Sequence, residues 1–347
     1  MIPFYIGTYS GVGKQTGILL STLDTKSGAI TEPQTVSGLE NPSFLATSPD
    51  GKFLYAAIEH EGGAVAAFRI QGDHSLAPLN TKPSGGKGAC HVWADGTHVV
   101  VSNYSSGNVN GFPVLPDGSL GDATADVAFS GSGPHPKRQQ KPFAHAAIRT
   151  PDGRFVYVCD LGTDHVWIFR LDPDSGKLIP ADPDSGSVPP GAGPRHLALH
   201  PKSDFLYVNN EMGLSVSAFG RDHETGALRL IQTIPTLPDE AVRDGATTSA
   251  LAIHPNGRWL YVSNRGHNSI SIFEIQPDGT LTMTQNTASI ADTPREFAID
   301  PSGTWLLVAG QKDGLVVSMK INSEDGTLTP ASRLQTNSIP VSLAFLP

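Results

Sequence analysis

The chain has 347 residues, with 24 basic and 33 acidic side chains and a formal net charge of −9. This charge disfavours nucleic acid and anionic membrane surfaces as partners, although it is compatible with a small basic pocket. Glycine (37) and proline (28) are abundant, charged residues make up only 16% and apolar residues 38%, which favours a turn-rich β protein over a helical or disordered one.

The first residues, Met-Ile-Pro-Phe-Tyr-Ile-Gly-Thr-Tyr, lack the charged and apolar regions of a secretory signal. No apolar run approaches the roughly 20 residues that cross a bilayer. The two cysteines, Cys90 and Cys159, make neither a disulfide framework nor a zinc ligand set, and we expect them to be buried thiols. We therefore expect a cytoplasmic protein with no membrane partner.

A hairpin of two short apolar runs around a polar turn recurs six times along the chain. The copies cover residues 42–59, 89–104, 144–160, 194–211, 248–265 and 294–311. Most of the turns begin with proline and contain glycine, as tight hairpins require. Consecutive copies are offset by about 50 residues, an interval typical of propeller blades.

Two further runs follow most hairpins. The first of them alternates apolar and polar residues, as in Ala64–Ile70 and Ser269–Ile275, and the second is weaker, as in Leu76–Asn80 and Thr280–Met283. Each repeat thus contains four predicted antiparallel strands. Four strands repeated at this interval indicate a β-propeller.

The two ends of the chain together supply one more repeat. Residues 340–347 match a first strand, while Phe4–Tyr9, Gly17–Asp24 and Ala29–Val36 match the second, third and fourth. We therefore predict one all-β domain over residues 1–347, a seven-bladed β-propeller whose last blade is closed by both termini. Because a closed ring has no free sheet edge, we expect a monomer.

The strand order predicts where a site lies. In a propeller the first strand of each blade lines the central channel, so the starts of first strands and the ends of second strands converge on one mouth. The first-strand starts supply Ser43, His91, His145, Arg195, His196, Arg295 and Glu296. The second-strand ends supply Glu59, Asn103, Tyr104, Asp160, Asn210, Glu211, Asn264, Arg265 and Gln311.

Two long segments, Gly121–Phe143 and Leu237–Thr247, precede first strands and are predicted to be loops that open on the same face. The first loop carries Lys137 and Arg138. Each polar residue at the mouth also has a structural interpretation, such as an ion pair between Arg195 and Glu211. The functional hypothesis rests on their convergence. No phosphate-binding or dinucleotide motif follows a strand, so we expect no cofactor, and the arginines would repel a metal ion.

The chain resembles the lactonase family of seven-bladed propellers over essentially its whole length. The most specific stretches are Tyr5–Tyr9, Arg138–His145, Pro151–Asp164, Gly193–His196, Asn210–Glu211 and Ser263–Gly266. The resemblance implies an active-site set of His, Arg, Glu and Arg, which falls on His145, Arg195, Glu211 and Arg265. Many relatives have a histidine at the position of Phe143.

The resemblance also implies a reaction, the hydrolysis of an anionic sugar lactone, with 6-phospho-D-glucono-1,5-lactone as the first candidate. In it, His145 would activate water, the two arginines would stabilise the oxyanion, and Glu211 would orient them or protonate the leaving oxygen. The expected substrate contacts are His196, Arg295, Glu296, His91, Asn103, Asp160, Lys137 and Arg138. A carboxymuconate cycloisomerase and a non-catalytic interaction propeller are the alternatives.

Overall fold

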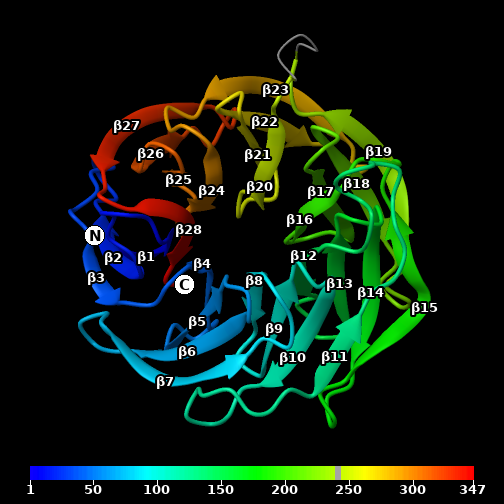
Figure 1. The fold of residues 1–347 in the computed structure, drawn as a ribbon. Coiled ribbons are helices and arrows are strands. Elements are labelled where there is room, and N and C mark those ends of the chain that lie inside the picture. Colours follow the sequence, from blue (N-terminus) through cyan, green and yellow to red (C-terminus); the bar gives the residue numbers. More distant parts are fainter. Residues whose placement is uncertain (239–243) are drawn as a thin grey trace.

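The computed structural model describes residues 1–238 and 244–347. In these residues, seven four-stranded antiparallel sheets surround a central axis, as Figure 1 shows. The predicted seven-bladed β-propeller is thereby confirmed. None of the described residues forms a helix that is long and apolar enough to cross a membrane.

The inner half of each blade is the predicted hairpin. The strands nearest the axis are β4 (Pro42–Thr47), β8 (Ala89–Ala94), β12 (Ala144–Arg149), β16 (Pro194–Leu199), β20 (Thr247–Ile253), β24 (Pro294–Ile299) and β28 (Ile339–Phe345). The second strands are β5 (Phe53–Ile58), β9 (His98–Asn103), β13 (Phe155–Asp160), β17 (Phe205–Asn210), β21 (Trp259–Arg265), β25 (Trp305–Gly310) and β1 (Ile2–Tyr9).

The outer half of each blade holds the third and fourth strands. The third strands are β6 (Ala64–Ile70), β10 (Asn108–Pro113), β14 (His165–Leu171), β18 (Ser215–Arg221), β22 (Ser269–Ile275), β26 (Leu315–Ile321) and β2 (Ile18–Leu23). The fourth strands are β7 (Leu76–Pro83), β11 (Ala125–Ala128), β15 (Leu178–Ser187), β19 (Leu228–Pro235), β23 (Leu281–Ala288), β27 (Leu328–Gln335) and β3 (Gln34–Ser37).

Both termini lie in one blade (Figure 1), because β1 pairs with β28 on one side and with β2 on the other. The register of β1 and β28 runs from Phe4 opposite Phe345 to Tyr9 opposite Ile339. This confirms the predicted closure by the chain ends. The pairing removes the two sheet edges that an open ring would expose.

Several predicted boundaries were wrong. The fourth strands expected to end at Asn80 and Met283 continue to Pro83 and Ala288. The fourth strand expected from Ala29 begins only at Gln34, because Ile30 makes an isolated bridge to Leu23 and Pro33 has no N–H to donate to a ladder. The segment Gly121–Phe143 is not a loop throughout, since it contains β11. That strand is only four residues long and lacks an alternating apolar pattern. Of the second expected loop, residues 239–243 lie outside the described residues.

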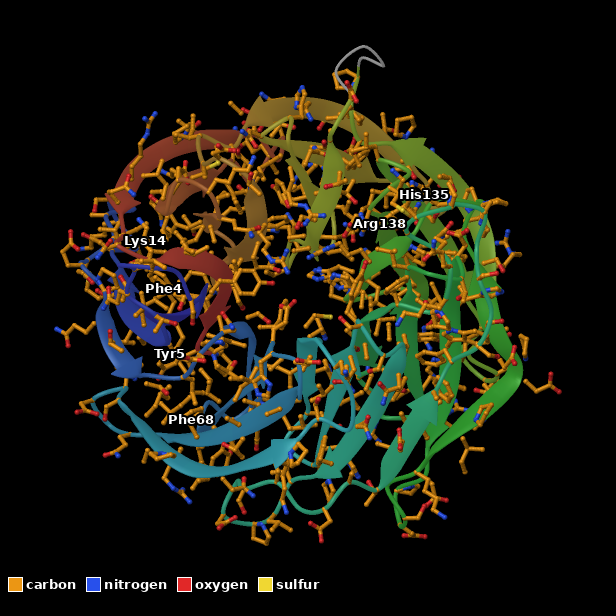
Figure 2. The ribbon with its side chains drawn as sticks, viewed as in Figure 1. Phe4, Tyr5, Lys14, Phe68, His135 and Arg138 are labelled. Carbon is orange, nitrogen blue, oxygen red and sulfur yellow. The ribbon has the colours of Figure 1, made fainter. Side chains whose placement is uncertain are left out.

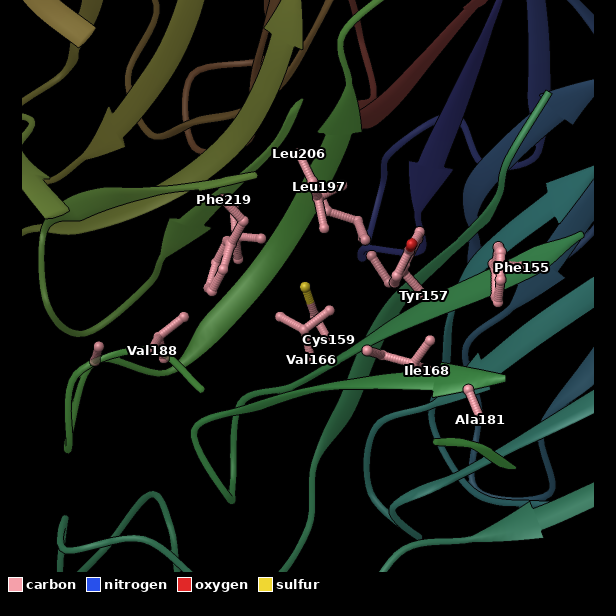
Figure 3. Close-up of a cluster of buried hydrophobic side chains, with 13 residues drawn as sticks. Phe155, Tyr157, Cys159, Val166, Ile168, Ala181, Val188, Leu197, Leu206 and Phe219 are labelled. Atoms are coloured by element: carbon pink, nitrogen blue, oxygen red, sulfur yellow. The ribbon is translucent and has the colours of Figure 1, made fainter. Parts of the chain in front are cut away.

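The apolar core lies between neighbouring blades. One cluster joins β13 and β14 to β16, β17 and β18, and it includes Phe155, Tyr157, Cys159, Leu206 and Phe219, as Figure 3 shows. Similar clusters lie between the other neighbouring blades of the described chain. Burying one such large side chain contributes about 1.5–3 kcal/mol. Both cysteine thiols are buried, as expected.

A tyrosine in the second strand links each of several blades to the next one. Its hydroxyl donates to the carbonyl of a glycine in the turn between the third and fourth strands of the neighbour, at 2.9–3.1 Å. The pairs are Tyr55 with Gly118, Tyr157 with Gly226, Tyr207 with Gly279, and Tyr261 with Gly326. Each glycine has a positive φ, and a Cβ there would collide with an aromatic ring of the preceding blade.

We expect Tyr207→Phe to lower the free energy of unfolding by about 1–2 kcal/mol, because the carbonyl of Gly279 loses its buried donor. Urea unfolding followed by fluorescence would measure the change. The double variant Tyr207→Phe/Tyr261→Phe should show the sum of the two single effects, since the hydrogen bonds lie in different interfaces. Unchanged stability in both single variants would contradict this role of the tyrosines.

Candidate active site

The innermost strands are irregular at the mouth of the ring. In β8, β12, β16 and β24 the pairing with the second strand shifts register next to the strand start. The residues at these shifts are Cys90, His145, Arg195 and Arg295. All four line the same cavity. A β-bulge re-aims side chains and is common beside active sites, and here it turns four residues into one cavity.

The second strands supply the rest of the lining from their ends. Glu59, Tyr104, Glu211 and Gln311 each directly follow a second strand, whereas Tyr9 and Arg265 end one. Arg138 comes from the loop before β12 and lies beside the central opening in Figure 2. Together with it, these residues enclose a cavity of about 270 Å³. The predicted convergence of strand starts and strand ends on one mouth is therefore confirmed.

Glu211 joins three arginines. Its Oε1 accepts from Nη2 of Arg138 at 2.6 Å, and its Oε2 lies 3.0 Å from both Nε of Arg195 and Nη2 of Arg265. One carboxylate thus holds guanidinium groups from three successive parts of the ring. Because three cations share one anion, the cluster keeps an excess of positive charge inside a protein of net charge −9.

The protonation states in this cluster are fixed by burial and by neighbours. Burial alone would raise the pKa of Glu211, but Arg265, Arg195 and Arg138 lower it to about 2. Burial, followed by repulsion from Arg265 and Arg295, lowers the pKa of Arg195 to about 10, so this group remains a cation at neutral pH. A carboxylate with such a low pKa is a poor proton donor at neutral pH, whereas its contacts hold three guanidinium groups in place.

Three histidine rings pack against one another near Arg195, which His196 contacts. The centroids of His145 and His196 are 5.2 Å apart, and those of His91 and His196 are 5.6 Å apart. Burial, with the charge of Arg195, lowers the pKa of all three, that of His91 to about 3. They are therefore neutral at physiological pH, and His145 is the one that lines the cavity.

His145 has one enclosed nitrogen without a partner. No described residue hydrogen-bonds to its Nδ1, although this atom is shielded from solvent. An unsatisfied buried polar atom is uncommon and costs free energy. Since Nδ1 is enclosed, Nε2 is the ring nitrogen that remains available to hydrogen-bond a molecule in the cavity.

His196, Glu296 and His91, which were expected to contact substrate, lie behind the cavity lining. Nε2 of His196 and Nη1 of Arg195 are 2.9 Å apart, and Nδ1 of His196 is 3.9 Å from Oε2 of Glu296. Burial raises the pKa of Glu296 to about 7. The ring of His91 packs against that of Phe44 at a tilt of 34°, with ring centroids 4.2 Å apart. These residues are placed to support Arg195 and the imidazoles.

Three other expected contacts lie away from the cavity lining. Asn103 donates to the carbonyl of Ser84 at 3.0 Å. Asp160 accepts from the backbone N–H of Phe143 at 2.7 Å, which fixes the loop before β12. Lys137 is exposed on its loop, whereas its neighbour Arg138 reaches Glu211. Substrate contact by Asn103, Asp160 and Lys137 stays a prediction.

The sequence interpretation missed two lining residues, Tyr9 and Cys90. Tyr9 ends the second strand of the blade shared by the termini, so the rule that identified Glu59 and Glu211 applied to it as well. Cys90 precedes His91 at the register shift. The ring of Phe143 packs against that of Tyr104 at a tilt of 33°, with ring centroids 4.8 Å apart. In the described part of the chain, no three His, Cys, Asp or Glu side chains are grouped as a metal site requires.

Comparison with known proteins agrees with this architecture. A family model described as "Lactonase, 7-bladed beta-propeller" matches residues 3–345. The chain is 36% identical over 347 residues to 6-phosphogluconolactonase of Bacillus subtilis, and the match covers 99% of this chain and 97% of that protein. It is 31% identical over 334 residues to 6-phosphogluconolactonase of Formosa agariphila, covering 93% and 94%.

Solved structures are similar over the same length. A Bacteroides fragilis structure has a TM-score of 0.93 and 32% identity, and it covers 100% of this chain and 98% of its own. The periplasmic gluconolactonase of Pseudomonas aeruginosa has a TM-score of 0.90 and 27% identity, and the match covers 100% of this chain and 99% of that one. The similarity therefore extends around the whole ring.

We expect Glu211→Gln to destabilise the protein by about 3 kcal/mol at neutral pH, since the native pKa of Glu211 is about 2. Because the folded pKa is depressed, this stabilisation is present above the unfolded pKa and is lost as pH falls through the folded pKa. The difference between the variant and the parent should therefore shrink between about pH 4.5 and pH 2. Denaturant titrations across this range, with the exposed Glu32→Gln as control, would measure it, and a difference that is constant with pH would contradict the charge argument.

Proposed function

The chain belongs to the seven-bladed β-propeller lactonase family, and we propose that it hydrolyses the lactone of a phosphorylated sugar acid, with 6-phospho-D-glucono-1,5-lactone as the first candidate. The relatives named 6-phosphogluconolactonase, at 31–36% identity over at least 93% of the chain, support this substrate. The observation that carries the proposal is a neutral imidazole, His145, in one cavity with the arginines held by Glu211.

In the proposed reaction, His145 takes a proton from a water molecule while the water oxygen attacks the lactone carbonyl carbon. The negative charge that develops on the carbonyl oxygen is stabilised by the guanidinium groups of Arg195 and Arg265. The ring C–O bond then breaks, and His145 returns its proton to the departing alkoxide oxygen. The product is an open-chain hydroxy acid, and the histidine is neutral again.

The positions of the arginines favour this chemistry. Nε and Nη1 of Arg195 are used by Glu211, His196 and the carbonyl of Ser249, which holds the guanidinium plane in place. Preorganised donors stabilise a developing charge without having to reorient during the reaction. The polar, positively charged lining is also suited to a small anionic substrate rather than to an apolar protein partner.

We expect His145→Ala and Arg195→Met each to lower kcat for 6-phosphogluconolactone by at least about 100-fold, the usual effect of losing a general base or an oxyanion donor. Acid release followed at constant pH would measure turnover, and circular dichroism would verify the fold. The control is Arg258→Met, because Arg258 lies in the turn between β20 and β21, on the face of the ring opposite the cavity. Full turnover in either site variant would contradict the roles assigned here. If the parent protein releases no acid from 6-phosphogluconolactone but lowers the absorbance of a carboxymuconate, the result would indicate a cycloisomerase.

The pH dependence of the parent enzyme tests the base separately. Burial and the neighbouring cations lower the pKa of His145 well below 6.5, so the imidazole is already deprotonated at neutral pH. We expect kcat/KM to be independent of pH from about 6.5 to 8 and to fall only at more acidic pH, as the free base becomes protonated. An inflection at pH 6.5 or above, after subtraction of spontaneous hydrolysis, would contradict a base with a lowered pKa.

A further inference from the structure

The groups assigned to the reaction occupy only one side of the cavity. His145 lies in β12, Arg195 in β16 and Arg265 in β21, and Glu211 directly follows β17. These strands belong to three successive blades, and Arg138 comes from the loop before β12. We call these five residues the Glu211 wall. The other side is formed by Arg295, Gln311, Tyr9 and Glu59, from the blades that hold β24, β28 and β4. We call these four residues the Arg295 wall.

Arg295 is held differently from the arginines of the Glu211 wall. Its Nη2 donates to the hydroxyl of Tyr9 at 2.7 Å, and its guanidinium lies 5.1 Å from the centre of the Tyr9 ring. Tyr9 in turn donates to Oε2 of Glu59 at 2.6 Å. The chain of contacts fixes Arg295 through a neutral phenol instead of a carboxylate.

The charge of Arg295 has no direct counterion among the residues that the structure describes. Within 4.0 Å, Arg138, Arg195 and Arg265 each have the carboxylate of Glu211, whereas no described carboxylate comes this close to Arg295. Burial lowers the pKa of Arg295, but the surrounding groups, with Tyr9 and Glu59 first among them, raise it above its usual value, so the group stays charged. Its Nε and Nη1 have no hydrogen-bond partner in the described chain, and Arg295 lines the cavity.

The neighbours of Arg295 add groups of a different kind. Glu59 presents a carboxylate, which accepts hydrogen bonds, and Gln311 presents an amide, which both donates and accepts. Such groups suit hydroxyls, whereas a guanidinium with free N–H groups suits a phosphate or a carboxylate. The Arg295 wall therefore combines one anion receptor with acceptors and donors for a polyol.

From this arrangement we propose that the Arg295 wall binds the non-reacting end of the substrate, with its anionic group on Arg295 and its hydroxyls near Glu59 and Gln311. The inference rests on the proposed function, because it assumes that the reacting carbonyl lies on the Glu211 wall. It assigns the substrate an orientation across the axis. It also makes Arg295 the residue that distinguishes a phosphorylated lactone from the same lactone without phosphate.

The test compares two substrates that differ only in the phosphate, 6-phospho-D-glucono-1,5-lactone and D-glucono-1,5-lactone. The measured quantity is the ratio of their kcat/KM values. We expect Arg295→Met to lower this ratio by about 10- to 100-fold, as for the loss of one charge-assisted hydrogen bond, mainly through KM of the phosphorylated lactone. Arg295→Lys keeps the charge and should lower the ratio by a smaller factor, and Arg258→Met should keep the parent ratio.

The possible results separate this inference from the proposed function. An unchanged ratio in Arg295→Met, or an equal loss for both lactones in a variant with a native circular dichroism spectrum, would overturn the assignment of Arg295. If the parent protein hydrolyses neither lactone, the proposed function fails, and calorimetric titration with 6-phosphogluconate and with gluconate replaces the assay. Binding of 6-phosphogluconate that is lost in Arg295→Met but kept in Arg258→Met would still support the subsite, and equal binding by both variants would overturn it.

Discussion

The pairing of β1 with β28 is the interaction on which the rest of the molecule depends. Each blade buries its apolar residues only against its neighbours, so a ring with one missing contact would expose two blade faces and two sheet edges. This closure joins the first and the last strand of the ring in one blade. The tyrosine–glycine hydrogen bonds then fix the rotation of one blade on the next.

The closed ring also explains why distant residues can share one electrostatic environment. Two buried glutamates near the axis have opposite properties: Glu211, among three guanidinium groups, has a pKa of about 2, whereas burial raises that of Glu296 to about 7. Their positions differ, because Glu211 lines the cavity and Glu296 is not among the lining residues. The arrangement of neighbouring cations, more than the depth of burial, decides which carboxyl is charged.

The architecture and much of the cavity could be predicted from the sequence because they follow from repetition. The hairpins, their turns and the shared blade recur with a regular register, so a single rule placed Arg195, Glu211 and Arg265 together. The rule does not predict local departures from the repeat. The start of β3 depends on Pro33, β11 has no apolar alternation, and the register shifts that aim Cys90 and Arg295 into the cavity are set by one residue each. The layer that separates His196 and Glu296 from the cavity depends on three-dimensional packing, which a strand pattern does not contain.

The cavity residues span the chain from Tyr9 to Gln311 and come from all seven blades. The shortest contiguous segment that contains both walls is residues 9–311, because Tyr9 and Gln311 both belong to the Arg295 wall. The cavity is therefore complete only when the whole ring has folded. Under the proposed function, an assay of substrate binding would therefore also report how much of a preparation has a closed ring.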